Sequence, residues 1–207
     1  MIRYFTSWYN EPNDARRAEL ITCIQKCCDS QDIDFVYLLC EAPAPIMHEK
    51  LKEIPVSTRV TYDDFILLAN AMSEAGDVVL INNIDIFPAP KTRTQLERIQ
   101  PNQAWALSRW DVQADGSLVH FCRKDTADTW CFRAPIKKVS SNFYLAIPGC
   151  DNAFAYRLQQ AGYEVSNPSK DVKFCHLHLT GVRNYVSGRD SIPAPYLMVE
   201  PTSLLVQ

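Results

Sequence analysis

The sequence predicts a single α/β domain with a mostly parallel central sheet flanked by helices. Its 207 residues suit one domain of ordinary size. Apolar runs of strand length alternate with segments of helical periodicity along the first half of the chain. One of these runs, Val78–Ile81, contains no polar residue, as expected for a strand covered by helices on both faces.

The chain opens with a strand, a helix and a second strand. Residues 2–8 are rich in aromatic and β-branched side chains and are followed by turn-forming residues at 10–13. Apolar positions recur at helical spacing from Asp14 to about Cys28. Residues 34–40 then form an apolar run of strand length, so we expect two parallel strands joined by a helix.

A second helix and a buried strand come next. Thr61 with Asp64 three positions later is a capping-box pattern, and apolar residues from Phe65 to Met72 mark one helix face before Gly76. Residues 77–81 form the buried strand described above. In sheets of this kind ligands bind beyond the carboxyl ends of the strands.

The second half of the chain is less regular. Residues 105–109 predict a strand, and residues 118–122 predict another that can pair with it. A strand at 128–132, a helix from 151 to 161 ended by Gly162, and an alternating strand at 172–179 complete the domain, which we place at residues 1–185. Residues 186–207 contain three prolines and are expected to form an extended tail.

Composition excludes several classes of protein. The apolar fraction of 47% excludes a disordered chain, and the net charge of −3 argues against tight nonspecific binding to DNA. The eight cysteines form no Cys-x-x-Cys pair, so we expect reduced, buried thiols and no structural zinc. We expect a cytoplasmic protein, because the first residues lack a signal-peptide core and no apolar run reaches membrane-span length.

The segment Asn83-Ile84-Asp85 places oxygen-bearing side chains where the buried strand ends. A carboxylate in this position can hold Mg²⁺ or Mn²⁺, and such an ion neutralises the negative charge of a diphosphate. A simple strand-end turn is the alternative, because Asn and Asp favour turns.

A second candidate segment follows near the end of the domain, between His176 and Arg183. His178 is a candidate to complete an oxygen-rich metal shell, and His176 shares its strand face but is the weaker candidate. Gly181 allows close approach of a phosphate to the backbone, and Arg183 can bind phosphate with two donors. Packing in the core is the alternative for either histidine.

The order of elements from the first strand to about Tyr185, together with these two segments, resembles the GT-A-fold glycosyltransferases. In that family a short Asp-x-Asp-type motif ends a buried strand, and Asn83 here replaces its first carboxylate. The resemblance implies that Asp85 and His178 bind the metal, and that Asn83, Gly181 and Arg183 contact a nucleoside-diphosphate sugar. It also implies that the loop after the first strand, with Thr6, Trp8 and Tyr9, meets the base and ribose.

Asp151 stands immediately before the last predicted helix. In inverting members of the fold a carboxylate at a helix start removes the proton of the acceptor hydroxyl, and Asp151 is similar to it. An N-cap is the other interpretation, and the helix dipole would then lower the pKa of this carboxylate. Side chains that suit sugar binding are Arg109, Asp111, Asp128 and Trp130.

The sequence thus predicts a metal-dependent glycosyltransferase for a hexosyl or pentosyl group, with an acceptor hydroxyl on a glycan or small molecule. One alternative is transfer to a hydroxylated base in DNA, with Arg123, Lys124, Arg133, Lys137 and Lys138 lining a local groove. A nucleotidyltransferase is disfavoured, because no Gly-rich phosphate loop stands near the amino terminus. A non-catalytic module that binds sugar or nucleotide is the third alternative.

Overall fold

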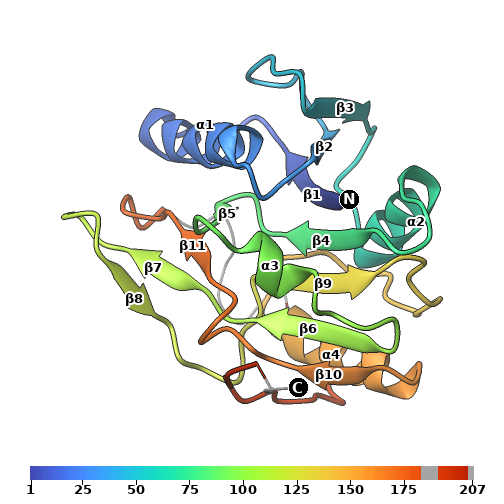
Figure 1. Cartoon of the computed structure of the whole chain (residues 1–207). Helices are drawn as coiled ribbons and strands as arrows, with labels where there is room; N and C mark the ends of the chain where they lie inside the picture. The colour runs from blue at the N-terminus through green and yellow to red at the C-terminus, as the bar shows by residue number, and fades with distance from the viewer. Residues whose placement is uncertain (183–190, 205–207) are drawn as a thin grey trace.

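A computed structural model describes residues 1–182 and 191–204. Its centre is a seven-stranded sheet in the order β10-β6-β9-β4-β1-β2-β3, and a four-stranded sheet in the order β5-β11-β7-β8 lies beside it (Figure 1). All neighbours in the large sheet are parallel except β9, which is antiparallel to both β4 and β6. The prediction of an α/β domain with a mostly parallel sheet is confirmed.

The elements have the following bounds. The large sheet contains β1 (Ile2–Trp8), β2 (Phe35–Cys40), β3 (Leu51–Pro55), β4 (Val78–Asn82), β6 (Gln103–Leu107), β9 (Thr129–Arg133) and β10 (Glu164–Ser166). The small sheet contains β5 (Ile86–Pro88), β7 (Trp110–Val112), β8 (Leu118–His120) and β11 (Phe174–His176). The helices are α1 (Asp14–Asp29), α2 (Tyr62–Met72), α3 (Arg93–Leu96) and α4 (Cys150–Gln160).

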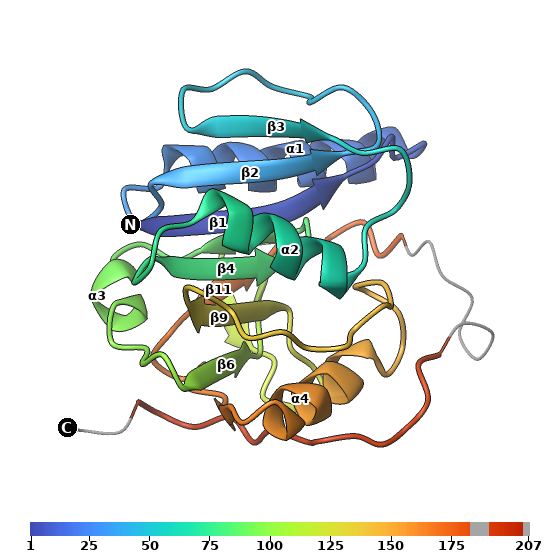
Figure 2. The same cartoon turned by 90° about the vertical axis from the view of Figure 1, so that its right-hand side faces the viewer.

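The two faces of the large sheet carry separate cores. Phe65 of α2 and Phe154 of α4 pack with Ile81 and Trp130 on one face. The other core joins α1, α3 and the small sheet to the opposite face of the same strands, with members that include Leu20, Leu80, Leu96 and Phe174. Figure 2 shows α2 and α4 in front of the sheet and α1 behind it. The alternation of side chains along β4 and β9 divides the residues between the two cores.

Local chemistry explains where the predicted helices begin. Asn13 caps α1 by accepting from the Arg16 N–H, and Thr61 and Asp64 form the predicted capping box of α2. The strands predicted at 2–8, 34–40, 77–81 and 128–132 are confirmed within one residue at each end. The short elements β3, β5, β10 and α3 were not predicted, because three to five residues carry too little periodicity.

The small sheet differs from the prediction in two ways. β8 pairs with β7 of the small sheet and not with β6 of the large one, so the expected pairing of residues 105–109 with 118–122 is wrong. The predicted strand at 172–179 is also too long, since only Phe174–His176 is a strand. The chain leaves the ladder after His176, and His178 therefore lies in a loop.

The C-terminal segment 191–204 is extended and bonded to the domain along its length. Backbone N–H groups donate from Ile192 to the Pro148 carbonyl and from Leu197 to the Asn152 carbonyl. Gly149 lies beneath this segment, and a Cβ there would come within 2.7 Å of the Ile192 carbonyl oxygen. With φ of +82°, this position requires glycine for its space and for its backbone conformation.

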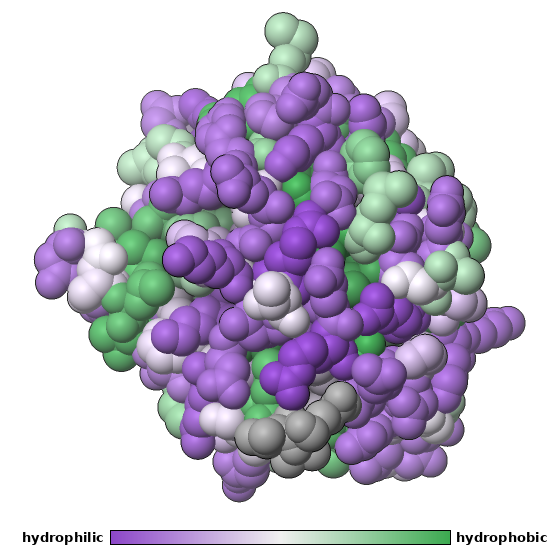
Figure 3. Space-filling view, in the orientation of Figure 1, coloured by the Kyte–Doolittle hydropathy of each residue, from purple (hydrophilic) through white to green (hydrophobic). Residues whose placement is uncertain are grey.

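The molecular surface is mostly hydrophilic, with a hydrophobic region over the β7–β8 hairpin at the left of Figure 3. Leu118 and Val119 of β8 are 39% and 54% exposed there. Among the described residues, no helix is both long and apolar enough to cross a membrane.

Asp77, just before β4, gives a prediction for stability. Burial alone would raise its pKa, but hydrogen bonds from the Met1 amino group, the Glu74 N–H and Arg3 lower it to about 2. The stabilisation is therefore present above about pH 4 and is lost as the pH falls towards 2. We expect Asp77→Asn to lower the free energy of unfolding by about 2 kcal/mol at pH 7, measured by urea denaturation.

The exposed Glu49→Gln variant is the control for this measurement. An Asp77→Asn protein as stable as that control at pH 7 would contradict the assignment of the buried ion pair.

Candidate active site

Polar side chains converge where the strands of the large sheet end. Asn83 and Asp85 follow β4, and Arg109 follows β6. β9 is antiparallel to both strands, so its first residues return to this same edge, where Asp128 precedes it. The antiparallel strand thus brings residues separated by more than 40 positions to one edge.

Asp85, His176 and His178 form a cluster with the geometry of a metal site. Their ligand atoms all lie within 4.8 Å of one another. The Asp85 Oδ2 atom is 3.1 Å from His176 Nε2 and 4.0 Å from His178 Nδ1. Ligand atoms about 2.1 Å from an octahedral ion stand about 3.0 Å apart when adjacent, so the spacing of Asp85 and His176 suits such an ion.

Each histidine is oriented by a hydrogen bond on its other ring nitrogen. His178 Nε2 lies 2.7 Å from the Val182 carbonyl oxygen, which leaves Nδ1 as the unprotonated nitrogen facing Asp85. His176 Nδ1 lies 2.7 Å from the Asp111 carboxylate, which leaves Nε2 directed at Asp85. A carboxylate or carbonyl behind a histidine is the usual support of a metal ligand.

Charge around Asp85 is balanced by Arg16 and the histidines. Burial alone would raise the pKa of Asp85, but the His176 hydrogen bond and the Arg16 charge hold it far below its usual range. Burial alone would lower the pKa of His176, and the contact with Asp85 raises it instead. Burial and the Arg16 charge lower the pKa of His178, which keeps that ring neutral.

A second group of charges continues from this cluster along the sheet edge. Arg109 donates to Asp111 at 2.8 Å and to Asp128 at 3.3 Å. Asn83 donates to Asp128 at 3.1 Å. The side-chain amide at the first position of the Asn83-Ile84-Asp85 segment is thus bonded to the carboxylate that precedes β9. Arg109, Asp111 and Asp128 therefore form one network with His176.

Asp151 lies at the first turn of α4, and its surroundings differ from those predicted for an N-cap. The N-cap is Gly149, and it makes no side-chain cap bond. The expected lowering of the Asp151 pKa by the helix end is also wrong, because burial and the charge of Asp128 raise it to about 7. Tyr62 places its hydroxyl 3.5 Å from the Asp151 carboxylate, and the Ala127 N–H also contacts it.

The expected nucleotide-binding residues lie in different surroundings. Trp8 is 3% exposed, and its indole N–H donates to the Pro43 carbonyl, so its ring offers no face to a base. Thr6 is 1% exposed and donates to the Asn82 carbonyl, which supports the end of β4. Tyr9 is partly exposed. Gly181 has φ of +67°, and no atom of the described residues lies within 4 Å of a Cβ placed there, as expected of a position where a ligand approaches the backbone.

Trp130 and Arg183 are the two remaining residues of the predicted site. Trp130 is 1% exposed and packs edge-on against both Tyr62 and Phe154, so its expected contact with a sugar is wrong for this structure. Its N–H donates to the Tyr62 hydroxyl, and it thereby supports the group next to Asp151. Arg183 lies outside the described residues.

Sequence reasoning missed Arg16 and Tyr62 and placed His176 second to His178. Arg16 belongs to the first turn of a helix that is far from Asp85 in sequence, and an arginine there resembles any surface charge. The spacing of His176 and His178 did carry a signal, because alternate residues at a strand end project together.

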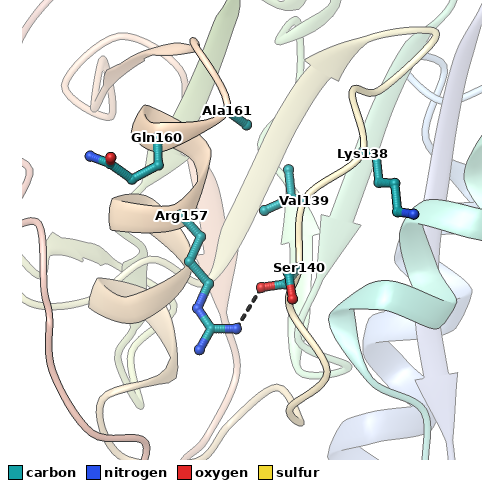
Figure 4. Close-up of a pocket in the computed structure, with 6 residues that line it drawn as sticks. All are labelled: Lys138, Val139, Ser140, Arg157, Gln160 and Ala161. Carbon is teal, nitrogen blue, oxygen red and sulfur yellow. Dashed lines mark hydrogen bonds between the residues drawn. The ribbon is translucent and has the colours of Figure 1, made fainter.

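Two open hollows of the described surface lie away from this cluster. One, of about 400 Å³, is open and lies beside the C-terminal half of α4. Its lining is Lys138, Val139, Ser140, Arg157, Gln160 and Ala161, and Figure 4 shows Arg157 bonded to the Ser140 carbonyl across it. None of these residues belongs to the charged network, and Arg16 donates to Asp85 within the cluster itself.

Comparison with known proteins supports the fold. No family model matches the sequence, and no curated protein matches it. The mannosyltransferase PcManGT from Pyrobaculum calidifontis, solved with GDP-Man and Mn²⁺, is similar over 86% of this chain and 56% of its own, with 11% identity and a TM-score of 0.55. This chain thus spans little more than half of that transferase.

Two other solved structures are less similar. The galactosyltransferase LgtC matches 86% of this chain and 87% of its own at 11% identity and a TM-score of 0.44. A 4-diphosphocytidyl-2C-methyl-D-erythritol synthase from Anaerococcus prevotii matches 64% and 70% at 12% identity and a TM-score of 0.43. Together with the strand order, the match to the mannosyltransferase establishes a GT-A-like fold.

The geometry of the cluster gives a prediction for metal binding, with Mn²⁺ as the probe. His178→Ala removes a candidate ligand, and Asp111→Asn removes the carboxylate behind His176. We expect Asp111→Asn to weaken Mn²⁺ binding by about 10- to 100-fold, as is usual for an outer-shell partner, and His178→Ala to weaken it at least as much. The electron paramagnetic resonance signal of free Mn²⁺ measures both.

His48→Gln is the control, because His48 lies between β2 and β3 and pairs with Asp29. Mn²⁺ affinities equal to that of His48→Gln in both variants would place the ion elsewhere.

Proposed function

We propose that this protein is a glycosyltransferase that moves a hexosyl or pentosyl group from a nucleoside-diphosphate sugar to an acceptor hydroxyl with the help of a divalent ion. The observation that supports this most directly is the cluster of Asp85, His176 and His178 immediately beyond β4 of a GT-A-like sheet. Ligands of α/β sheets bind at this edge.

The residues of the cluster fit Mn²⁺ or Mg²⁺ in number and type. A carboxylate oxygen and two imidazole nitrogens, each held by an outer partner, leave other positions for diphosphate oxygens. A divalent ion held there supplies positive charge that neutralises the departing diphosphate. The role of the protein is then to hold the three ligands and to exclude water around them.

The donor-binding part of the proposal depends on Gly181, Asn83, Tyr9 and Arg183. Gly181 leaves its backbone open to a phosphate, and Asn83, two residues before Asp85, donates to Asp128. Tyr9 is the partly exposed aromatic residue beyond β1 and is the candidate to contact the base. Arg183 is retained on sequence grounds as a diphosphate contact, and Arg109, Asp111 and Asp128 as contacts of the sugar.

Asp151 is the proposed general base. The acceptor oxygen attacks the anomeric carbon and gives its proton to Asp151, while the bond to the diphosphate breaks and leaves its electrons on the phosphate oxygen. A pKa of about 7 suits this role, because the group is partly ionised at neutral pH and still binds a proton well. Asp128, which accepts from Asn83, lies near enough to Asp151 for its charge to raise the Asp151 pKa.

A nucleic-acid acceptor receives less support, because most of the cations suggested for it are engaged. Arg123 and Lys124 pair with Asp125 and Glu200. Arg133 donates to backbone carbonyls of residues 76, 97 and 99. A non-catalytic module that binds a nucleotide sugar is the alternative that the experiments below distinguish.

We expect a nucleoside diphosphate to bind tightly only in the presence of Mn²⁺ or Mg²⁺, because the charges of Arg16 and Arg109 are already balanced by carboxylates of the site. Calorimetric titration of UDP and GDP with Mn²⁺ and with chelator measures this. A panel of nucleotide sugars, scored by the rise in melting temperature, then identifies the donor. An equal nucleotide affinity with metal and with chelator would show that the cluster of Asp85, His176 and His178 takes no part in nucleotide binding.

We expect Asp151→Asn to lower the transfer rate by about 10²- to 10⁴-fold, the usual value of a general base. The wild-type rate should rise with pH through about 7 as Asp151 ionises. Retention of configuration at the anomeric carbon, read by NMR of the product, would remove the role of Asp151 as base. Tight donor binding without transfer in the wild type would favour a non-catalytic module.

Asp151 also makes a prediction for stability. The folded-state pKa of about 7 lies above the ordinary value of 3.8, so the folded protein holds a proton that the unfolded chain releases. Stability contributed by this group is therefore present below about pH 4 and is lost as the pH rises through 7. We expect Asp151→Asn to be more stable than wild type by about 1–3 kcal/mol at pH 8, measured by urea denaturation. An equally stable variant would contradict the burial of this carboxylate.

A further inference from the structure

Arg16 is a buried cation in an unfavourable place. It belongs to the first turn of α1, where the helix dipole disfavours positive charge, and it is 6% exposed. Three oxygen atoms hold its guanidinium: Asp85 Oδ2 at 2.5 Å, Glu19 Oε2 at 2.9 Å and the Leu177 carbonyl at 2.9 Å. A positive charge at a helix N-terminus is unfavourable, and burial adds to its cost. Such a residue at a candidate active site indicates a functional requirement.

The guanidinium occupies the oxygen that a metal ion would need. Asp85 Oδ2 is the carboxylate atom that pairs with both His176 Nε2 and His178 Nδ1, and it is also the atom that Arg16 binds. A divalent ion on this oxygen and a guanidinium 2.5 Å from it would repel each other strongly. The two cations therefore exclude each other at Asp85.

Arg16 has a second attachment that connects it to the phosphate-binding segment. Glu19, its partner at 2.9 Å, also accepts from the Thr180 N–H at 2.8 Å and the Thr180 hydroxyl at 2.9 Å. Thr180 is next to Gly181, which has open space around it. A guanidinium that leaves Asp85 and keeps Glu19 thus stays beside the segment where a diphosphate is proposed to bind.

We propose that Arg16 is an internal counter-ion that exchanges with the divalent ion at Asp85 and then binds the diphosphate of the donor. Only the binding of Arg16 to the diphosphate rests on the proposed function; the exchange with the ion at Asp85 does not. Without nucleotide, Arg16 neutralises Asp85 and keeps the affinity for metal low. When the metal arrives with a nucleoside diphosphate, the phosphate oxygens accept the hydrogen bonds that Asp85 gives up, so metal and nucleotide bind with positive coupling.

Mn²⁺ binding without nucleotide tests the exchange directly. We expect Arg16→Gln to bind Mn²⁺ at least about tenfold more tightly than wild type, because the competing charge is gone. Arg17→Gln is the matched control, since Arg17 is the next residue of the same helix and pairs with Asp14 on the outside. An Arg16→Gln affinity equal to or weaker than that of Arg17→Gln overturns the proposal.

The nucleotide arm tests the second half separately. We expect UDP or GDP to strengthen Mn²⁺ binding more in wild type than in Arg16→Gln, and the variant to lose about tenfold in diphosphate affinity at saturating Mn²⁺. An unchanged coupling would overturn the role of Arg16 as a diphosphate ligand. Absence of any diphosphate binding by wild type would refute the proposed function and leave the metal-only result standing.

Two further measurements test the proposal even if Arg16→Gln does not fold. Arg16→Lys keeps the charge, but one ammonium cannot span all three acceptors, so we expect an intermediate Mn²⁺ affinity. A crystal structure of wild type with Mn²⁺ should show the ion on Asp85, His176 and His178, with Arg16 no longer within hydrogen-bonding distance of Asp85. An ion on Asp85 with the Arg16 bond retained would overturn the exchange.

Discussion

The buried carboxylate of Asp85 is the constraint around which the candidate site is arranged. A negative charge placed where β4 ends must be matched by positive charge, because burial makes an unpaired carboxylate costly. Arg16 from α1 and His176 from β11 meet this need, and Asp111 then balances His176. Elements from both sheets and from the first helix are held together by this single requirement.

The carboxylate of Asp151 is also buried, but its pKa is shifted in the opposite direction to that of Asp85. It too is desolvated, but no cation among the described residues pairs with it, and the charge of Asp128 opposes its ionisation. One carboxylate at the sheet edge is therefore held as an anion suited to a cation, and the other is held near half-ionisation and suited to proton transfer.

Much of the fold was predictable because it is local. Apolar runs gave β1, β2, β4 and β9, and the capping pattern at Thr61 gave the start of α2. The strands β5 and β7 of the small sheet could not be predicted, because three residues carry no clear period. The pairing of β8 with β7 was missed because β7 itself was not predicted.

For the site, the sequence by itself determined the chemistry available: Asp85 after a buried strand, His178 beside Gly181, and Asp151 before a helix. Only the tertiary structure decided which groups meet and in which state of charge. It placed Arg16 on Asp85 and His176 between two carboxylates, and it buried Asp151 beside Tyr62. The physical reason is that charge state depends on burial and on neighbours, and long-range packing sets both.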